Sequence, residues 1–439
     1  MTGNFLQQEV ETIRRSELEE LQLKRLRWQV KRCYENSAFY REKFNELNVT
    51  PDNVKKIEDI AKLPFLKKDE LRSEQANHPP FGRYVIAPTE SWRELHPSTG
   101  TTGMPVNTIW SAQDIKSIVE FTSRTMWSWG VRPGDIVQNG FSYGLWIAGI
   151  AVHYAASRMG CFVIPMGATM TERQIDYMGM VKSNIFVSTP SFALYLAEIL
   201  RKQGIKPENL ALEKGCFGGE PGTELPTTRR KIESGLGLDA HDYYGLSEIN
   251  PTMASECTEK SGLHWSEDHH LIEIIDQDTL EPCSPGEQGV LVITHLTREA
   301  TPMIRYWTND LAILELDKCG CGRTHGRSPR GIQGRADDMI IYKGAKFYPL
   351  QVEKVVRDIP ELGEEFRIAI RRNKERDTDI CSIQVEYVSG NINRNELKKK
   401  LEDELKKEIS VTPEIEFLEE GVLERTTFKA KRIVAARDS

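Results

Sequence analysis

With 439 residues, 39% of them hydrophobic and 28% charged, the chain has a globular composition and is too long for one core, so two or more domains are expected. Its formal charge of −7 argues against a nucleic-acid partner, and no stretch approaches the ~20 apolar residues that cross a bilayer. Because the N-terminus also lacks the apolar core of a signal peptide, we expect a cytoplasmic protein without a membrane partner and with reduced cysteines.

The first two thirds of the chain show helical and then alternating patterns. Residues 6–47 carry leucines at helical spacing among Lys, Arg and Glu, which predicts a helical lead-in. Further on, Cys161–Met166 and Ile185–Ser188 are predicted to be buried strands. A helix with the capping-box pair Thr171 and Gln174 follows the first strand, and a helix capped by Thr189–Pro190 follows the second. This alternation predicts βα units around a largely parallel sheet.

The last hundred residues have a different pattern. Apolar strands alternate with two helices, of which one begins near Pro349 and the other covers Arg394–Ile409 with apolar residues on one face. The predicted strands are Met339–Tyr342, Phe366–Ile370, Ile380–Val388 and Glu414–Leu418. We therefore predict an α/β N-terminal domain with βα units around mixed sheets, residues 1–334, and a small α+β C-terminal domain, residues 335–439.

The clearest local motif is Ser98-Thr99-Gly100-Thr101-Thr102-Gly103. Two glycines among hydroxyl residues form a turn whose backbone amides and hydroxyls can surround a polyphosphate. The motif is not a P-loop, because the Gly-Lys-Ser/Thr ending is missing. By itself it is equally well explained as a polar surface loop.

Three further motifs follow in order, Asp242–Glu248, Arg305–Asp310 and Gly334–Asp338. Together with the glycine loop they resemble the acyl-adenylate-forming superfamily of acyl-CoA synthetases and adenylation domains, and within it the phenylacetate–CoA ligase family. The segments Phe217–Pro221, Ala254–Cys257, Gly262–His264 and Trp265–Asp268 carry the closer resemblance, which extends from Leu63 to Arg432. It implies the adenylate-forming fold, with a mobile C-terminal domain that swings on a hinge at Asp337.

The resemblance also implies where ATP and Mg²⁺ bind. The Ser98–Gly103 loop would hold the β- and γ-phosphates, and Glu248 would ligate Mg²⁺, a hard cation that prefers oxygen ligands. Tyr244 would lie near the adenine, and Asp310 would accept the ribose hydroxyls. The other nucleotide-binding residues implied are Gly219, Glu220, Pro221, Asp242, Tyr243, Gly245 and Ser247.

Two cations are implied to act in catalysis. Lys429 would bridge the attacking carboxylate and the α-phosphate, where it stabilises developing charge. Arg335 would lie by the ribose and phosphate after domain closure. Coenzyme A would pass along Tyr342–Gly344 in a second pose of the C-terminal domain. The chain departs from the family at Met104, where lysine is usual, and at Phe428, where glycine is usual, and both changes put full activity in question.

A second group of residues predicts a structural zinc site. Cys319 and Cys321 are separated by one glycine, and Cys257 and His264 lie seven residues apart upstream. Thiolate and imidazole ligands suit a tetrahedral zinc ion, and four protein ligands would leave no open position for catalysis. His325 is the rival fourth ligand, and unrelated reduced thiols are the alternative explanation.

The family resemblance places the acid between the segment 139–146 and the turn 218–220. Phe141, Trp146, Gly219, Tyr243 and Gly245 would line this site. Family members commonly have phenylalanine at position 146 and a branched aliphatic residue at 243, so Trp146 and Tyr243 imply a tighter pocket with one phenolic hydroxyl available to the substrate. The competing interpretation is that these aromatic residues are part of the core.

The leading functional hypothesis is therefore an AMP-forming acyl-CoA ligase for a small aryl or arylacetic acid, with ATP, Mg²⁺ and coenzyme A. One alternative is an adenylyltransferase of the same fold that does not use coenzyme A, and another is a ligase for a smaller, non-aryl acid. A third is a non-catalytic nucleotide-responsive protein. The sequence leaves a homodimer open.

Overall fold

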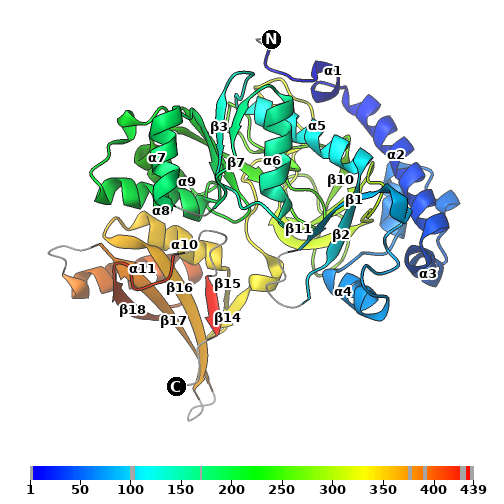
Figure 1. Ribbon diagram of the computed structural model, residues 1–439. Coiled ribbons are helices and arrows are strands. Elements are labelled where there is room, and N and C mark those ends of the chain that lie inside the picture. The colour runs from blue at the N-terminus through cyan, green and yellow to red at the C-terminus, as the bar shows by residue number, and fades with distance from the viewer. Residues whose placement is uncertain are drawn as a thin grey trace.

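The computed structural model of the chain describes residues 3–98, 104–168, 171–373, 378–388, 393–425 and 432–435. Three helices form the predicted lead-in along the outer edge of the larger part of the molecule (Figure 1), and they are α1 (Gln8–Glu11), α2 (Arg15–Asn36) and α3 (Ala38–Glu46). The inner face of α2 buries Leu18, Leu26 and Val30, so the apolar spacing reflects packing. Among the described helices, none combines the length and the apolar character that a membrane span requires.

An eight-stranded sheet forms the centre of the larger part. Its order is β13 (Arg327–Ser328), β9 (Leu263–Trp265), β8 (Ala254–Ser255), β7 (Asp239–Tyr244), β6 (Lys214–Gly218), β5 (Ile185–Ser188), β3 (Ile136–Asn139) and β4 (Phe162–Ile164). The five strands from β7 to β4 are parallel, and parallel neighbours need crossover connections. The crossover helices are α6 (Ile147–Arg158), α7 (Thr171–Val181), α8 (Pro190–Lys202) and α9 (Pro226–Leu236). The predicted βα alternation is confirmed.

Two local predictions in this sheet are wrong. β4 is an edge strand, and Phe162 on it is 61% exposed rather than buried, because nothing in the described part of the chain pairs with its outer side. Gln174 does not form a capping box. Its side-chain amide donates to the Gly167 carbonyl, and its side-chain oxygen accepts from Gln138, so it ties α7 to the sheet instead.

Two smaller antiparallel sheets complete the larger part. β1 (Trp92–Pro97) pairs with β2 (Asn107–Ser111), and the predicted phosphate loop lies in the connection between them. β10 (His270–Ile275), β11 (Gly289–His295) and β12 (Tyr306–Ala312) form the other sheet. Leu66, just before α4 (Lys68–Asn77), pairs with Tyr306 as an extra bridge on β12, which brings the start of α4 to the centre of the molecule.

The C-terminal part has its own core. A mixed sheet of β18 (Glu414–Glu419), β17 (Thr378–Tyr387), β16 (Leu362–Asn373) and β19 (Ile433–Ala435) packs with α10 (Pro349–Asp358) and α11 (Arg394–Ile409), and β14 (Ile340–Tyr342) pairs with β15 (Ala345–Phe347) (Figure 1). Its apolar cluster begins at Ile340 and draws on no residue before it. The α/β and α+β fold classes are confirmed, while the exact domain boundary at 334/335 stays a prediction.

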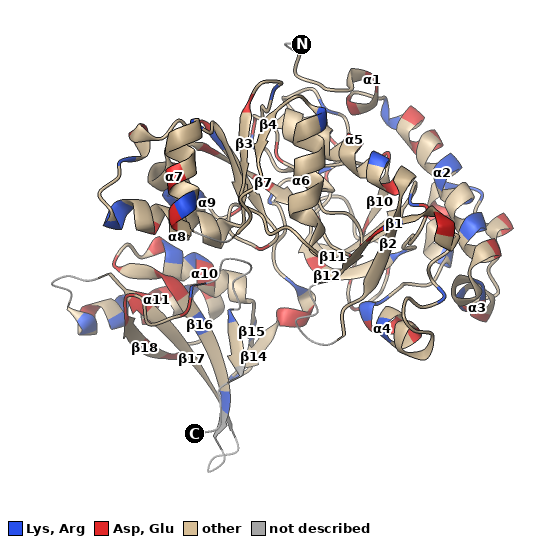
Figure 2. Cartoon of the chain, viewed as in Figure 1, with Lys and Arg blue, Asp and Glu red and all other residues tan. Residues whose placement is uncertain are grey.

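Ion pairs connect the C-terminal part to α8 and α9. Arg201 Nη2 lies 3.1 Å from Glu420 Oε1, and Lys231 Nζ lies 3.0 Å from Glu364 Oε1. Figure 2 shows acidic and basic residues mixed along the helices on both sides of this contact. Because ion pairs near the surface each contribute little free energy, they favour this arrangement of the two parts without fixing it rigidly.

Candidate functional site

Two of the predicted motifs meet at the carboxyl ends of the parallel strands. The turn Gly218–Pro221 follows β6, and Asp242–Gly245 ends β7, the next strand in the sheet. A side chain at Gly218 would lie 2.4 Å from the Tyr243 carbonyl oxygen, and one at Gly245 would lie 1.9 Å from the Pro251 carbonyl oxygen. Only glycine therefore allows these backbones to approach so closely.

Asp310 is the centre of a hydrogen-bonded group of predicted site residues. Its Oδ1 lies 2.8 Å from Arg335 Nη1, and its Oδ2 accepts a hydrogen bond from the Tyr244 hydroxyl. The other side of the Arg335 fork contacts Asp337 at 2.9 and 3.0 Å. Burial, and then the Asp310 charge, raise the pKa of Tyr244 well above its usual value, so its hydroxyl keeps the proton that it donates.

Asp242 lies in a cluster of buried acidic residues. Burial raises its pKa well above the usual value, and the neighbouring carboxylates of Glu224 and Glu256 act in the same direction. Burial also raises the pKa of Glu224 to about 7, while Glu256 pairs with Arg229 at 2.7 Å. Burial thus favours the neutral form of the Asp242 carboxyl group, which can both donate and accept a hydrogen bond.

Glu248 is only 5% exposed and is held by Lys68, which the sequence did not single out, and by Tyr306 of the Arg305–Asp310 motif. Lys68 Nζ lies 2.7 Å from Glu248 Oε1, and the buried Tyr306 hydroxyl also hydrogen-bonds Glu248. Lys68 comes from the start of α4 and Tyr306 from β12, and the Leu66–Tyr306 bridge places them together. The two residues come from distant parts of the chain, so no local pattern could have shown that they meet at Glu248. Ser247, in the same turn, is half-buried.

Only the base of the predicted phosphate loop is described. Ser98 is buried; its amide donates to the Val106 carbonyl at 2.8 Å, and its hydroxyl accepts from the Val106 amide at 3.0 Å. Residues 99–103 and Lys429 lie outside the described residues. Behind the loop, Arg72 Nε of α4 donates to the carbonyl of the half-exposed Met104 at 3.1 Å.

Three aromatic residues predicted to line the acid site are in contact. The rings of Phe141 and Tyr243 are 5.7 Å apart and perpendicular, and those of Phe141 and Trp146 are 5.5 Å apart. Gly219 has a φ of +87°, and a side chain there would lie 3.1 Å from the Trp146 ring, so Gly219 lies against that face. The structure thus brings Phe141, Trp146, Gly219 and Tyr243 together, in edge-to-face contacts typical of aromatic clusters.

The four predicted zinc ligands also meet. The ligand atoms of Cys257, His264, Cys319 and Cys321 all lie within 4.8 Å of one another. Cys257 Sγ is 3.9 Å from Cys319 Sγ, and Cys321 Sγ is 3.6 Å from His264 Nε2. A tetrahedral zinc ion with Zn–S bonds of about 2.3 Å requires ligand separations of about 3.8 Å, so the spacing fits.

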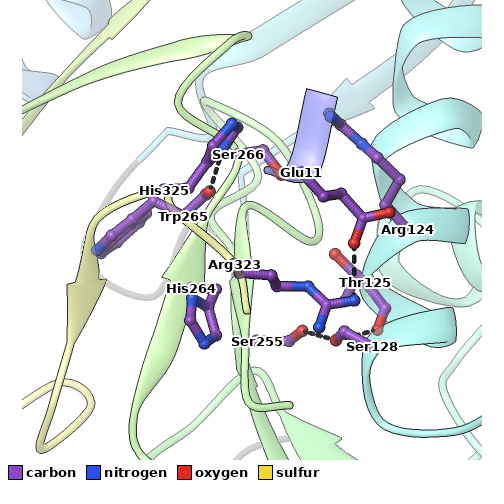
Figure 3. Close-up of a pocket in the computed structure, with 10 residues that line it drawn as sticks. All are labelled: Glu11, Arg124, Thr125, Ser128, Ser255, His264, Trp265, Ser266, Arg323 and His325. Carbon is purple, nitrogen blue, oxygen red and sulfur yellow. Dashed lines mark hydrogen bonds and ion pairs between the residues drawn. The ribbon is translucent and has the colours of Figure 1, made fainter. Parts of the chain in front are cut away.

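His325 belongs instead to the wall of a neighbouring cavity of about 40 Å³ (Figure 3). Its Nδ1 lies 3.0 Å from the Trp265 carbonyl oxygen and its Nε2 lies 3.1 Å from the Val10 carbonyl oxygen, so the backbone contacts both ring nitrogens. His264 lines the same cavity, and its Nδ1 is buried with no protein partner in the described structure. Because the cavity has room for about three water molecules, ordered water can bond Nδ1 and leave Nε2 for a metal.

Buried histidines support the turn that carries Glu248. His295 Nε2 lies 3.1 Å from the Ile249 carbonyl oxygen, and Asn250 contacts both His270 and Arg298. Burial lowers the pKa of His270 to about 4 and that of the adjacent His269 to about 3, and it lowers the pKa of His295 well below its usual value. All three imidazoles are therefore neutral in the folded protein at pH 7.

Acidification is expected to destabilise the chain through these histidines. Since the unfolded histidines have pKa values near 6.5, they bind protons before the folded ones do, and stability is lost as the pH falls from about 6.5 towards 4. At pH 5.5 the loss is about 1.4 kcal/mol for each histidine, or about 4 kcal/mol for the three. The raised pKa values of Asp242 and Glu224 act in the opposite direction over this range, so the histidine contribution is measured by comparison with a variant. Urea unfolding of the wild type and His270→Asn at pH 7.5 and 5.5 should show that the variant loses about 1.4 kcal/mol less on acidification. The same change in the free energy of unfolding in both proteins would contradict this account.

Comparison with known proteins adds an independent finding. The AMP-binding enzyme family matches residues 20–301, and the AMP-binding enzyme C-terminal domain matches residues 344–437. The phenylacetate-coenzyme A ligase of Thermus thermophilus is 37% identical over 98% of this chain and 99% of its own length. The enzyme of the same name from Aromatoleum evansii is 36% identical over 98% of this chain and 96% of its own length.

A solved structure is similar over almost the whole chain. The crystal structure of a 2-hydroxyisobutyryl-CoA ligase in the postadenylation state, in complex with 2-HIB-AMP, has a TM-score of 0.93 at 29% identity and covers 99% of this chain and 93% of that one. For the same ligase with 2-HIB-AMP and CoA in the thioesterification state, the TM-score is 0.75 at 30% identity, with the same coverage. The arrangement of the two parts of this chain is therefore more similar to the first of these two structures than to the second.

Proposed function

Because the chain belongs to the AMP-binding enzyme family, we propose that it is an AMP-forming acid–thiol ligase that joins a small aryl or arylacetic acid to coenzyme A. The observation that carries this proposal is the Tyr244–Asp310–Arg335 group beside Glu248, at the carboxyl ends of parallel strands, where α/β folds bind ligands. In the reaction, the carboxylate attacks the α-phosphate of ATP and releases pyrophosphate. The thiol of coenzyme A then attacks the acyl carbon and releases AMP.

The nucleotide would be held by Asp310, Tyr244 and Asp242. The Asp310 carboxylate is suited to accept both ribose hydroxyls, since Arg335 and the Tyr244 hydroxyl fix its orientation. Asp242, at the end of β7, is suited to the adenine edge, which presents both donors and acceptors, because the protonated form that burial favours also donates and accepts. Gly219, Glu220, Pro221, Gly245 and Ser247 would complete the walls, with the Ser98–Gly103 loop on the phosphates.

Glu248 would hold Mg²⁺, and the residues present fit that ion. A carboxylate oxygen is the ligand that Mg²⁺ prefers, and Glu248 is nearly buried and fixed by Lys68 and Tyr306. The ion would neutralise charge on the phosphates. Lys68 would then be released from Glu248 to meet a phosphate oxygen, which compensates for the lysine that the chain lacks at Met104.

Replacing Lys68 with alanine tests this role. We expect the KM for ATP to rise about tenfold, equivalent to about 1.4 kcal/mol, because a cation next to the phosphates is lost. The neighbouring Lys67, whose Nζ lies 5.7 Å from the centre of the Trp307 ring, is the matched control, and Lys67→Ala should keep the KM near its original value. An unchanged KM in Lys68→Ala across a range of Mg²⁺ concentrations would contradict the role.

The transfer steps would use residues on both sides of a hinge at Asp337. In the present arrangement Asp337 Oδ2 accepts hydrogen bonds from Asn309 and Arg335. These bonds lie at the border of the two parts, where a change of backbone angles moves one part as a body. Lys429 would serve adenylation in one pose, and the Tyr342–Gly344 turn would border coenzyme A in the other.

A structural zinc ion is the second proposal for this chain. Cys257, His264, Cys319 and Cys321 would hold it, since they supply four soft ligand atoms at tetrahedral spacing and no open position. The group joins the antiparallel end of the main sheet to the loop after β12, so the ion would stabilise that end of the sheet and take no part in catalysis.

The proposed ligase activity is tested with a panel of acids. Benzoate, phenylacetate, hydroxylated analogues and short acids are incubated with ATP, and AMP is measured with and without coenzyme A. A ligase releases AMP and consumes coenzyme A in equal amounts. AMP or pyrophosphate release that does not depend on coenzyme A would favour an adenylyltransferase, and no release with any acid would contradict both.

A further inference from the structure

The hydroxyl group of Tyr243 is buried and has no hydrogen-bond partner in the described structure. Two other buried tyrosines of the chain are paired. The Tyr40 hydroxyl donates to the Pro302 carbonyl at 2.7 Å, and the Tyr244 hydroxyl donates to Asp310. Buried polar groups are almost always satisfied, so an unpaired hydroxyl indicates a partner that the protein itself does not supply.

The position of Tyr243 in β7 shows on which face of the strand this hydroxyl lies. Successive side chains of a strand point to opposite faces, and Tyr244 reaches Asp310 in the nucleotide group. Tyr243 points the other way and packs edge-to-face on Phe141, whose ring lies against Trp146. The phenol therefore belongs to the proposed acid site, next to the carboxyl end of the strand.

The surroundings of Tyr243 limit what the partner is. It belongs to an apolar cluster whose other members include Phe141, Val152, Val187 and Cys216. Burial raises the pKa of Tyr243 well above its usual value, so the hydroxyl stays protonated and acts as a donor and an acceptor. An ionised group would be costly beside these apolar side chains, so a neutral oxygen is the suitable partner.

We propose that the Tyr243 hydroxyl selects the substrate by hydrogen-bonding a neutral oxygen, a hydroxyl or carbonyl group, on the non-reacting part of the acid. This inference rests on the proposed ligase function and adds the substrate class to it: oxygen-bearing acids in place of purely hydrocarbon ones. A site built to hydrogen-bond such a group discriminates strongly against the analogue without it, because the hydroxyl of the site is then left unpaired.

The experiment compares matched pairs of acids that differ by one oxygen. Phenylacetate is paired with 3- and 4-hydroxyphenylacetate, and 2-methylpropanoate with 2-hydroxy-2-methylpropanoate. In the wild type, kcat/KM for AMP release should favour the oxygen-bearing member of at least one pair by about 100-fold. In Tyr243→Phe this ratio should fall to within about threefold of one, mainly by loss on the oxygen-bearing acid. A ratio near one for every pair in the wild type, or the same ratio in Tyr243→Phe, would overturn the inference.

Thermal stability provides a second readout. Tyr243→Phe removes an unpaired hydroxyl and should leave the Tm of the free protein unchanged or higher. The matched control Tyr40→Phe removes a paired hydroxyl far from the site, so it should lower the Tm and leave the substrate ratio unchanged. A lower Tm in Tyr243→Phe would mean that the hydroxyl already has a partner and would overturn the inference.

The two proposals fail in different ways. If no acid of the panel releases AMP in either protein, the proposed ligase function is wrong as well. If AMP is released but the kcat/KM ratio is the same in the wild type and Tyr243→Phe, only the proposed selectivity is wrong.

Discussion

Replacement of Lys429 with alanine is expected to slow formation of the acyl-adenylate by about 1000-fold. Lys429 would place a positive charge where the carboxylate meets the α-phosphate. Such a charge stabilises the transition state of phosphoryl transfer more than it stabilises the bound substrates. Pyrophosphate exchange measures the first half-reaction. Formation of the thioester from a supplied acyl-adenylate measures the second half-reaction, which should stay within a fewfold of the wild-type rate because the lysine has left the site in that pose.

The matched control is Lys431→Ala, two residues along the chain. Because Lys429 and Lys431 both lie outside the described residues, the sequence motif alone assigns the role to Lys429. Lys431→Ala should adenylate at close to the wild-type rate. If Lys431→Ala shows the large loss, the catalytic lysine is the other one, and if Lys429→Ala slows both half-reactions equally, the assigned role is wrong.

Removal of the proposed zinc ion is expected to have the largest effect on stability. Without the ion, three thiols and an imidazole remain crowded within 4.8 Å of one another at the end of the sheet. We expect Cys319→Ser, or exhaustive chelation, to lower the free energy of unfolding by more than about 4 kcal/mol. With an unfolding entropy of about 2.1 cal/mol/K per residue over the predicted N-terminal domain, that loss corresponds to a fall in Tm of roughly 6 °C or more. Metal analysis of the purified protein should find about one zinc ion per chain.

Two variants separate the zinc site from general effects of losing a polar side chain. Cys283→Ser changes a half-buried cysteine outside the proposed site, whose thiol contacts the Gln288 carbonyl, and it should keep both the metal and the Tm. His325→Gln should lower stability through its backbone bonds but leave the zinc content at one per chain. A stable, metal-free wild-type protein would contradict the site.

Much of the fold could be predicted from the sequence because its signals are local. Thr189 and Pro190 begin α8 as predicted, with the Thr189 hydroxyl accepting from the Phe192 amide, and α11 has the predicted limits Arg394–Ile409. Caps and amphipathic spacing depend only on neighbouring residues. The burial of Phe162 was predicted wrongly because it depends on the place of its strand at the edge of the sheet, which no local pattern records.

In the candidate site, too, some residues could be predicted from local motifs and others could not. Asp310, Arg335 and Tyr244 were identified by their motifs, and the fold brings them together. Lys68 lies in no motif, and Tyr306 lies in the Arg305–Asp310 motif without a predicted role. Their contact with Glu248 could not be predicted, because it depends on a bridge between residues 66 and 306. The choice between His264 and His325 as the fourth metal ligand also needed the backbone contacts of His325. The family resemblance stated from the motifs is confirmed by the full-length relatives.

The claim that the reaction passes through an acyl-adenylate is tested most directly by following the carboxylate oxygen atoms of the acid. The reaction is run with an acid of the panel whose carboxylate carries two ¹⁸O atoms, together with ATP and coenzyme A, and the AMP is analysed by mass spectrometry. If the carboxylate attacks the α-phosphate and coenzyme A then displaces AMP, each AMP carries one ¹⁸O atom and the thioester keeps the other. Unlabelled AMP, or ¹⁸O found in inorganic phosphate beside ADP, would contradict an acyl-adenylate pathway.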